Sequence, residues 1–164
     1  MEIWYFVTLI GTPEIWLILT GVLVILYLYL RKRVHPRKKV LIKRVLIIFI
    51  TSLWLTAGVT FALKYAIPVK RPCTPCAENQ SNCNPYCPDD NAFPSGHSAI
   101  IFSVFTSMFL VFRKNKFLFL FVIPLLVALS RYMLVVHYPV DILAGSLIGI
   151  VIPFIVLKVY EKKI

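Results

Sequence analysis

Long apolar stretches alternate along the chain with short polar or basic segments. A helix needs roughly 20 mostly apolar residues, and usually about 17–25, to cross the hydrocarbon layer of a bilayer. Five stretches approach this length, and the first and third of them need flanking residues to reach it: residues 15–30, 45–63, 99–112, 117–136 and 140–157. The pattern therefore predicts an all-α, polytopic transmembrane helix bundle of about five spanning helices.

A further apolar stretch lies near the N-terminus, at residues 3–10. It is too short to span a bilayer alone, and Gly11, Thr12 and Pro13 interrupt it. We expect a short helix here that lies in the membrane interface. The start has no basic region and no small-residue cleavage site follows the first span, so we expect no cleavable signal peptide.

The composition agrees with the membrane prediction. Of the 164 residues 59% are hydrophobic, and the mean hydropathy is +0.82, whereas soluble domains carry about 45–50% apolar residues. Because the helices of one bundle must pack against one another, we expect residues 1–164 to form a single membrane-embedded domain.

The net charge of +11 is by itself compatible with binding to nucleic acid or to anionic lipid. The basic residues, however, gather in three clusters: residues 31–44, residues 113–116, and Lys158, Lys162 and Lys163. With five spans these clusters fall on one face, which the positive-inside rule makes cytoplasmic. We therefore expect a cell-membrane protein with a cytoplasmic C-terminus and no nucleic-acid partner.

All four cysteines lie in one polar loop at about residues 65–94, which this topology places on the extracytoplasmic side: Cys73, Cys76, Cys83 and Cys87. An even number of cysteines in such a loop indicates disulfides, in any of three connectivities. The alternative is a four-thiolate zinc site, because Cys73 and Cys76 have the spacing of zinc ligands. The topology favours disulfides, and either interpretation gives the cysteines a structural role.

Polar residues gather where the predicted spans meet the extracytoplasmic face. The second and fourth spans run outward and the third and fifth run inward, so their outer ends share that face. The residues concerned are Lys64, Arg71, Ser95, His97, His137 and Asp141. Arg131 lies within the fourth span, where a charge is costly and needs a partner. Each residue alone has an ordinary structural explanation, but the shared face predicts a functional site.

Three of these residues are cations that suit an anion the size of phosphate: Lys64, Arg71 and Arg131. A guanidinium matches the oxygens of a phosphate in bidentate fashion. Ser95 and Gly96 stand at the start of a predicted helix, where free N–H groups and the positive helix end favour an anion. We therefore expect these five residues to bind a phosphoryl group.

Two histidines supply the reactive groups. Asp141 can accept a proton from one ring nitrogen of His137, which leaves the other nitrogen free to attack. His97 can then protonate the leaving oxygen. The residue types and their shared face predict His137 as the nucleophile, Asp141 as its orienting partner and His97 as the general acid.

Three motifs carry a family resemblance: "KYAIPVKRP" at residues 64–72, "PSGH" at residues 94–97 and "SRYMLVVHYPVD" at residues 130–141. They match the signatures K-x6-RP, PSGH and SR-x5-H-x3-D in order and in spacing. The chain thus resembles the type 2 phosphatidic acid phosphatase superfamily, which includes lipid phosphatases, glucose-6-phosphatase-like enzymes, bacterial acid phosphatases and vanadium haloperoxidases. By motif the resemblance covers residues 64–141, and elsewhere it rests on hydropathy.

The resemblance implies the same roles for the same residues. It implies a phosphohistidine intermediate on His137 and stabilisation of the transition state by the cations. It also implies that no metal ion and no cofactor are needed. Two features depart from the family pattern: only two clear spans precede Lys64, where membrane members usually have three, and the cysteine-rich segment is an insertion that we expect to rim the site.

We therefore expect an integral membrane phosphatase with its site at the outer leaflet. The expected substrates are lipid phosphates or pyrophosphates, namely a polyprenyl pyrophosphate, phosphatidic acid or phosphatidylglycerophosphate. One alternative is a haloperoxidase that holds vanadate in the same pocket, against which the membrane composition argues. The other is a non-enzymatic transporter of lipids or anions, in which a histidine nucleophile has no use.

Overall fold

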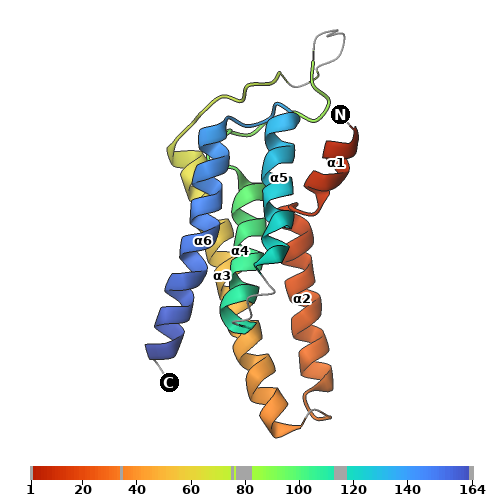
Figure 1. Ribbon diagram of the computed structural model, residues 1–164, viewed down its shortest axis with the longest axis vertical. Helices are drawn as coiled ribbons and strands as arrows, with labels where there is room; N and C mark the ends of the chain where they lie inside the picture. Colours follow the sequence, from red (N-terminus) through yellow and green to blue (C-terminus); the bar gives the residue numbers. More distant parts are fainter. Residues whose placement is uncertain (1, 34, 75, 77–82, 113–117, 163–164) are drawn as a thin grey trace.

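The computed structural model describes residues 2–33, 35–74, 76, 83–112 and 118–162 of the chain. The regular elements in these ranges are helices: α1 (Glu2–Leu9), α2 (Pro13–Leu30), α3 (Pro36–Ala66), α4 (Gly96–Phe112), the 3₁₀ helix η2 (Phe119–Phe121), α5 (Val122–Met133) and α6 (Pro139–Lys162). They form an elongated bundle of roughly parallel and antiparallel helices (Figure 1). The predicted all-helical membrane bundle is confirmed.

Three helical stretches are long and apolar enough to cross a bilayer: Glu2–Leu30, Lys38–Ala66 and Pro139–Lys162. Two shorter apolar helices accompany them, Gly96–Phe112 and Phe119–Met133. The short break after α1 falls at Gly11 and Thr12, and α2 begins with Pro13, whose missing N–H would have no helical partner at that position. The apolar side chains that face outward along these helices are those that lipid can cover.

Helix α3 begins earlier than the apolar pattern predicts. We expected its span at residues 45–63, and the helix starts at Pro36 inside the basic segment. Lysine and arginine are good helix formers and proline fits the first helical turn, so the basic residues extend the helix rather than form a loop. The second predicted basic cluster, residues 113–116, lies outside the described residues, as does Lys163.

Helix α4 lies at the centre of the bundle and contacts α2, α3, α5 and α6. Its closest neighbour is α6, because two glycines of α6 leave room for the α4 backbone. A Cβ atom at Gly145 would collide with the carbonyl oxygen of Ser95, and one at Gly149 with the carbonyl oxygen of Ala99. Small residues four apart allow such close helix contacts in membranes. The pair thereby fixes the start of α4 against the start of α6.

Helix α3 is joined to α4 by polar as well as apolar contacts. Thr56 donates a buried hydrogen bond to Ser103, with an Oγ1–Oγ distance of 3.0 Å. Leu53, Ile100 and Val104 form an apolar cluster beside this bond. The polar contact helps to set the register of the two helices, because in lipid a buried hydroxyl without a partner is costly.

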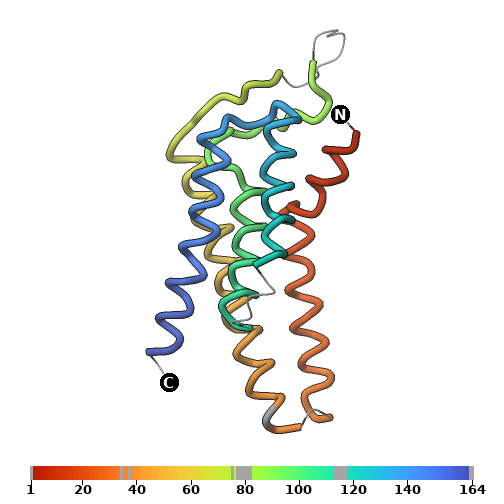
Figure 2. Tube along the Cα trace, viewed as in Figure 1, coloured from red at the N-terminus to blue at the C-terminus, as the bar shows by residue number. Residues whose placement is uncertain are grey.

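The connection between α3 and α4 crosses the ends of α6 and α5 and reaches toward α1 (Figure 2). Its two arms run alongside each other: Ala92 donates to the Val69 carbonyl at 2.8 Å and Asn84 donates to the Thr74 carbonyl at 2.9 Å. Two disulfides join the arms, Cys73–Cys87 and Cys76–Cys83. The structure therefore has a stapled segment over the helix ends that carry the predicted site.

Candidate active site

The His137 backbone is shaped by a sharp turn after α5. The helix ends at Met133, three residues before the end of the predicted span, and Val135 adopts a positive φ of 57°. A β-branched residue in this conformation is strained, and such strain persists only where neighbours enforce it. Two neighbours do so here, since the side chain of Asn84 donates to the Leu134 carbonyl and that of Arg71 donates to the Val136 carbonyl, both at 2.7 Å.

The imidazole of His137 is almost completely buried, and its two nitrogens face different partners. Nη1 of Arg71 lies 3.0 Å from Nε2 of His137. Because a guanidinium only donates, Nε2 must be the acceptor and the ring proton of the neutral form must sit on Nδ1. The Nε2 lone pair, which is the one available for attack, points toward the cationic cluster.

Burial lowers the pKa of His137 to about 4; the neighbouring Asp141 carboxylate opposes this shift, and the positive charge of Arg71 adds to it. The ring is therefore neutral at physiological pH. A neutral imidazole is the form that can act as a nucleophile.

Asp141 stands in the first turn of α6 and faces His137. Its Oδ2 lies 3.5 Å from Nδ1 of His137 and accepts a hydrogen bond from the Tyr138 backbone N–H at 2.9 Å. The separation from Nδ1 is longer than a hydrogen bond, as is common in unliganded sites that tighten around a substrate. Since both side chains are buried, the carboxylate is well placed to stabilise a positive charge on the ring.

The cations Lys64 and Arg71 converge on one acidic residue that the sequence did not single out. Asp90 accepts from Lys64, with an Nζ–Oδ2 distance of 2.8 Å, and its Oδ1 pairs with Nη2 of Arg71. Burial alone raises the pKa of Asp90, but the hydrogen bonds from Lys64 and Arg71 outweigh it and hold the pKa below its ordinary value. Asn91 completes the group by exchanging hydrogen bonds with the backbone and side chain of Lys64.

The first turn of α4 carries the second motif. The Ser95 N–H donates to the Asp141 carbonyl at 3.0 Å, and the Ser95 hydroxyl accepts from Ser98 at 3.1 Å. We expected the backbone N–H of Ser95 to bind an anion, but it bonds to the Asp141 carbonyl and so joins α4 to α6. The N–H groups of Gly96 and His97 belong to the first turn, where no helical acceptor exists, so they remain suited to an anion.

Arg131 is buried in α5, and its partner comes from the N-terminal helix. Its Nη1 donates to the Thr8 hydroxyl at 2.8 Å, and Thr8 is itself buried. Helix α1 packs against α5 (Figure 1), and Gly11 at its end lies against His97 and Val127. The N-terminal segment therefore contributes directly to the region of the predicted site.

The structure brings the predicted residues together at one end of the bundle. Electrostatic interactions link His97 with His137, Arg131, Arg71 and Lys64. Sequence reasoning missed Asp90, Asn91 and Thr8. Thr8 had a readable signal, as a small hydroxyl residue in a largely apolar stretch, whereas Asp90 looks the same as its neighbour Asp89 in a polar loop.

The arrangement places two histidines near one carboxylate, Asp141, and three cations. Among the described residues, no group of three or more His, Cys, Asp or Glu side chains is arranged to hold a metal ion. The positive charges at this end of the bundle are those of Lys64, Arg71 and Arg131, and in the empty site the Asp90 carboxylate pairs with the first two. Such fixed cations in a water-poor site can stabilise charge that develops on phosphoryl oxygens.

The fold and this cluster define a class: a polytopic membrane protein that carries cations and histidines at one end of its helix bundle. The chain belongs to the PAP2 superfamily, whose family model matches residues 45–164. The resemblance carried by the three motifs is thereby confirmed.

Two curated relatives match shorter segments. A bacitracin transport permease protein BcrC from Bacillus licheniformis is 43% identical over 61 residues, which are 37% of this chain and 30% of the relative. An undecaprenyl-diphosphatase from Sulfolobus acidocaldarius is 32% identical over 72 residues, 44% of this chain and 35% of the relative. The matches thus cover about a third of each relative's length.

Two solved structures share the fold. LpxE from Aquifex aeolicus has a TM-score of 0.70 at 24% identity, covering 96% of this chain and 84% of that one. A transmembrane PAP2-type phosphatidylglycerolphosphate phosphatase from Bacillus subtilis has a TM-score of 0.66 at 24% identity, covering 98% and 76%. The arrangement of the helices is therefore that of membrane proteins of this superfamily.

Proposed function

We propose that the protein is a metal-independent membrane phosphatase that hydrolyses a lipid phosphate or pyrophosphate through a phosphohistidine intermediate. The observation that carries the proposal is the state of His137: a buried, neutral ring whose Nε2 lone pair faces Arg71 while Asp141 stands at Nδ1. A pure binding site needs the cations alone. A neutral imidazole with a carboxylate behind it adds a nucleophile.

The reaction has two steps. In the first, Nε2 of His137 attacks phosphorus, the bond from phosphorus to the leaving oxygen breaks, and His97 gives that oxygen a proton. Asp141 stabilises the positive charge on the phosphorylated ring. In the second, His97 removes a proton from water, whose oxygen attacks phosphorus; inorganic phosphate leaves and His137 is restored. Lys64, Arg71 and Arg131 hold the phosphoryl oxygens throughout.

Among lipid phosphates we propose a polyprenyl pyrophosphate as the first substrate to test, since one relative is named an undecaprenyl-diphosphatase. Phosphatidic acid and phosphatidylglycerophosphate are the rivals. An apolar groove of about 430 Å³ between α2 and α3 supports a lipid substrate, because Trp54 and Phe61 line it and Lys64 lies at its polar end.

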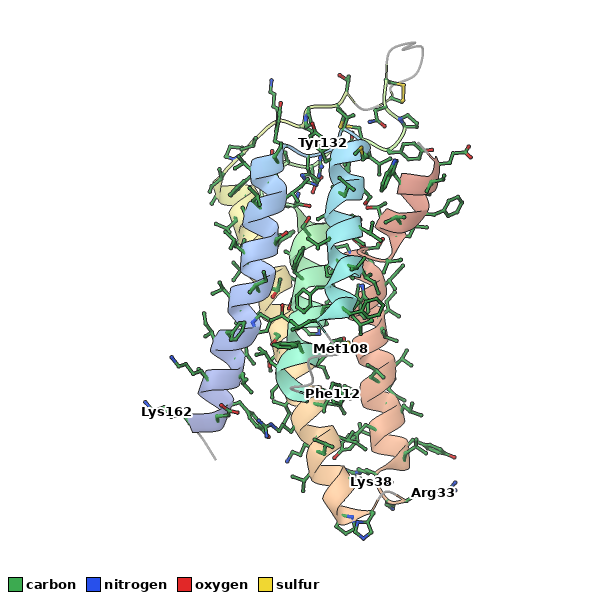
Figure 3. All side chains as sticks on the ribbon, in the orientation of Figure 1. Arg33, Lys38, Met108, Phe112, Tyr132 and Lys162 are labelled. Carbon is green, nitrogen blue, oxygen red and sulfur yellow. A yellow bond between two sulfur atoms is a disulfide. The ribbon has the colours of Figure 1, made fainter. Side chains whose placement is uncertain are left out.

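We further propose that the site faces the extracytoplasmic side of the cell membrane and the C-terminus faces the cytoplasm. The distribution of charge supports this orientation. Figure 3 labels Arg33, Lys38 and Lys162 at the end of the bundle opposite to Tyr132, near which the stapled segment lies. Basic residues of this kind are retained on the cytoplasmic side.

The test is release of inorganic phosphate by the purified protein in detergent with EDTA, with the three lipids compared side by side. We expect release with at least one of them, and a fall of about 10³-fold or more in His137→Ala because the nucleophile is gone. His35→Ala is the matched control, since His35 lies at the opposite end of α3 and should be neutral. Undiminished release from His137→Ala contradicts the mechanism.

A transporter of anions or lipids is the remaining alternative, and one relative bears the name of a transport permease. Trapping of the covalent intermediate separates the two functions. Quenching in alkaline detergent after brief incubation with a lipid radiolabelled in its terminal phosphate should leave label on His137, stable to base and lost on later treatment with acid. A transporter leaves no label.

A further inference from the structure

Arg71 has no hydrogen-bonding capacity to spare in the unliganded site. An arginine side chain carries five N–H donors. Nε donates to the Asp90 carbonyl at 2.9 Å, Nη1 lies against the Val136 carbonyl and His137 Nε2 at 2.7 and 3.0 Å, and Nη2 faces the Asp90 carboxylate and, at 3.4 Å, the Asn91 carbonyl. A phosphoryl group therefore binds Arg71 only if one of these partners leaves.

Asp90 is the partner that leaves most easily. Three of the other acceptors are backbone carbonyls, fixed by the paired arms and by the turn after α5. The Asp90 carboxylate sits on a rotatable side chain that is 54% exposed, whereas the Arg71 side chain is only 5% exposed. Rotation toward solvent hydrates the carboxylate and uncovers the buried guanidinium.

The same rotation frees Lys64. Its ammonium group pairs with the other carboxylate oxygen of Asp90 at 2.8 Å. Lys64 and Asp90 also line the polar end of the apolar groove between α2 and α3, so a lipid whose chain lies in that groove brings its phosphate to the position of Asp90. A phosphate carries about one and a half to two negative charges near neutral pH, against one on the carboxylate, so the exchange is favourable.

The first disulfide holds the backbone of Asp90 close to Arg71, while the carboxylate stays free to rotate. Cys73 follows Arg71 by two residues and Cys87 precedes Asp90 by three, so the Cys73–Cys87 bond ties together the two arms that carry the ion pair. A tether of this kind raises the effective concentration of the carboxylate at the guanidinium. The cysteine-rich insertion therefore places the Asp90 carboxylate in the site as well as covering the site.

We propose that Asp90 is an internal competing anion, which occupies the Lys64 and Arg71 donors in the empty site and is displaced by the phosphoryl group of the substrate. Asp90 thereby sets how tightly the site holds phosphate. This inference rests on the proposed function in that it assigns Lys64 and Arg71 to phosphate binding. A residue that merely positioned the two cations would have the opposite effect on affinity when removed.

The test is calorimetric titration of the full-length protein in detergent with inorganic phosphate, which requires no turnover. Asp90→Asn keeps the size and removes the charge, and we expect its dissociation constant for phosphate to fall about fivefold, the upper range for a half-exposed ion pair. Asp89→Asn makes the same charge change at the adjacent exposed position and should leave the constant unchanged. Asp90→Glu keeps the charge and should stay within about twofold of the parent protein.

Weaker or unchanged phosphate binding in Asp90→Asn overturns the proposal, and so does tighter binding that Asp89→Asn or Asp90→Glu reproduces. Thermal unfolding of each variant shows whether the protein compared is folded, and Asp90→Ala, which removes the same charge, decides the case if Asp90→Asn is not folded. Failure of the proposed function looks different: phosphate still binds as described, but no lipid phosphate is hydrolysed.

Discussion

His137 combines a strained connection, a buried ring and two opposed partners within a few residues. The positive φ at Val135 turns the chain back from α5, and Arg71 and Asn84 hold the turn through backbone carbonyls. Arg71 thus contacts both the turn before His137 and the carboxylate of Asp90, and under the proposed function it would orient the nucleophile and bind the phosphoryl group. Replacing it by lysine removes the fork that reaches both partners, because an ammonium group is a point charge.

The lowered pKa of His137 has a consequence for the pH profile. Activity that depends on the neutral ring is retained as pH falls through 6.5, the ordinary histidine value, and is lost only near pH 4. We expect the acidic limb of kcat/KM that belongs to His137 to lie near pH 4. Asp141 raises this pKa, so Asp141→Asn should move the limb to still lower pH while reducing kcat. A limb that stays at 6.5 in both proteins contradicts the assignment.

At this scale the sequence predicted that His137, Asp141 and the cations share one end of the bundle, but it did not identify Asp90, Asn91 and Thr8 as their partners. Asp141 lies in the first turn of α6 and His137 lies two residues before that helix. Their proximity follows from a spacing of four residues, which is a local property of the sequence. Asp90 comes from a loop, and its distance from Lys64 depends on how the two arms pair. No local pattern distinguishes it from Asp89, and the pairing of the four cysteines is equally hidden because three connectivities satisfy the same spacing.

At the scale of elements, the contact between α4 and α6 determines where the site residues stand. Gly145→Ala places a methyl group against the Ser95 carbonyl. We expect a loss of about 1–3 kcal/mol in stability and reduced activity, because neither helix backbone yields easily. The measurement is the thermal unfolding midpoint in detergent together with phosphate release.

Two other glycines provide the control for that substitution. A Cβ atom at Gly21 or Gly58 would meet nothing within 4 Å. Both Gly21→Ala and Gly58→Ala should therefore raise stability by up to about 1 kcal/mol through helix propensity. Gly21→Ala should also leave activity intact, whereas Gly58 lines the apolar groove and serves as a control for stability alone. A Gly145→Ala protein that unfolds at the same temperature as these two would show that α4 and α6 do not need their close contact.

Helix α1 has a definite role in this fold through Thr8. Thr8→Val keeps the shape of the side chain and leaves the Nη1 donor of Arg131 without its acceptor. Hydrogen bonds to charged groups contribute about 1.5–3 kcal/mol, so we expect kcat/KM to fall roughly tenfold or more. Thr8→Ser retains the hydroxyl and should retain activity. Equal activity of the valine and serine variants, at unchanged helix content, rules out this role for α1.

At the scale of the whole molecule, hydropathy and charge predicted the bundle because both are summed over many residues. The ends of individual helices were less predictable. Helix α3 begins within the basic segment, and α5 stops before His137. The second end could not be predicted, because nothing in the sequence indicates a positive φ at Val135. The basic side chains far from the site predict that the C-terminus faces the cytoplasm, and this topology can be tested directly. A fluorescent protein fused after residue 164 should fluoresce in the cytoplasm, and alkaline phosphatase fused there should be inactive.

The helices differ greatly in length, and this has a consequence for the membrane itself. Helix α3 has 31 residues and is about 46 Å long, whereas the stretch Phe119–Met133 extends only about 22 Å. Exposed side chains on α5, such as Leu125 and Leu129, face lipid whose hydrocarbon layer is about 30 Å thick. We therefore expect the bilayer beside α5 to thin, and a thick bilayer opposes this. In vesicles of short-chain phosphatidylcholine the protein should be more stable and more active than in long-chain vesicles, so membrane thickness acts on the turn that holds His137.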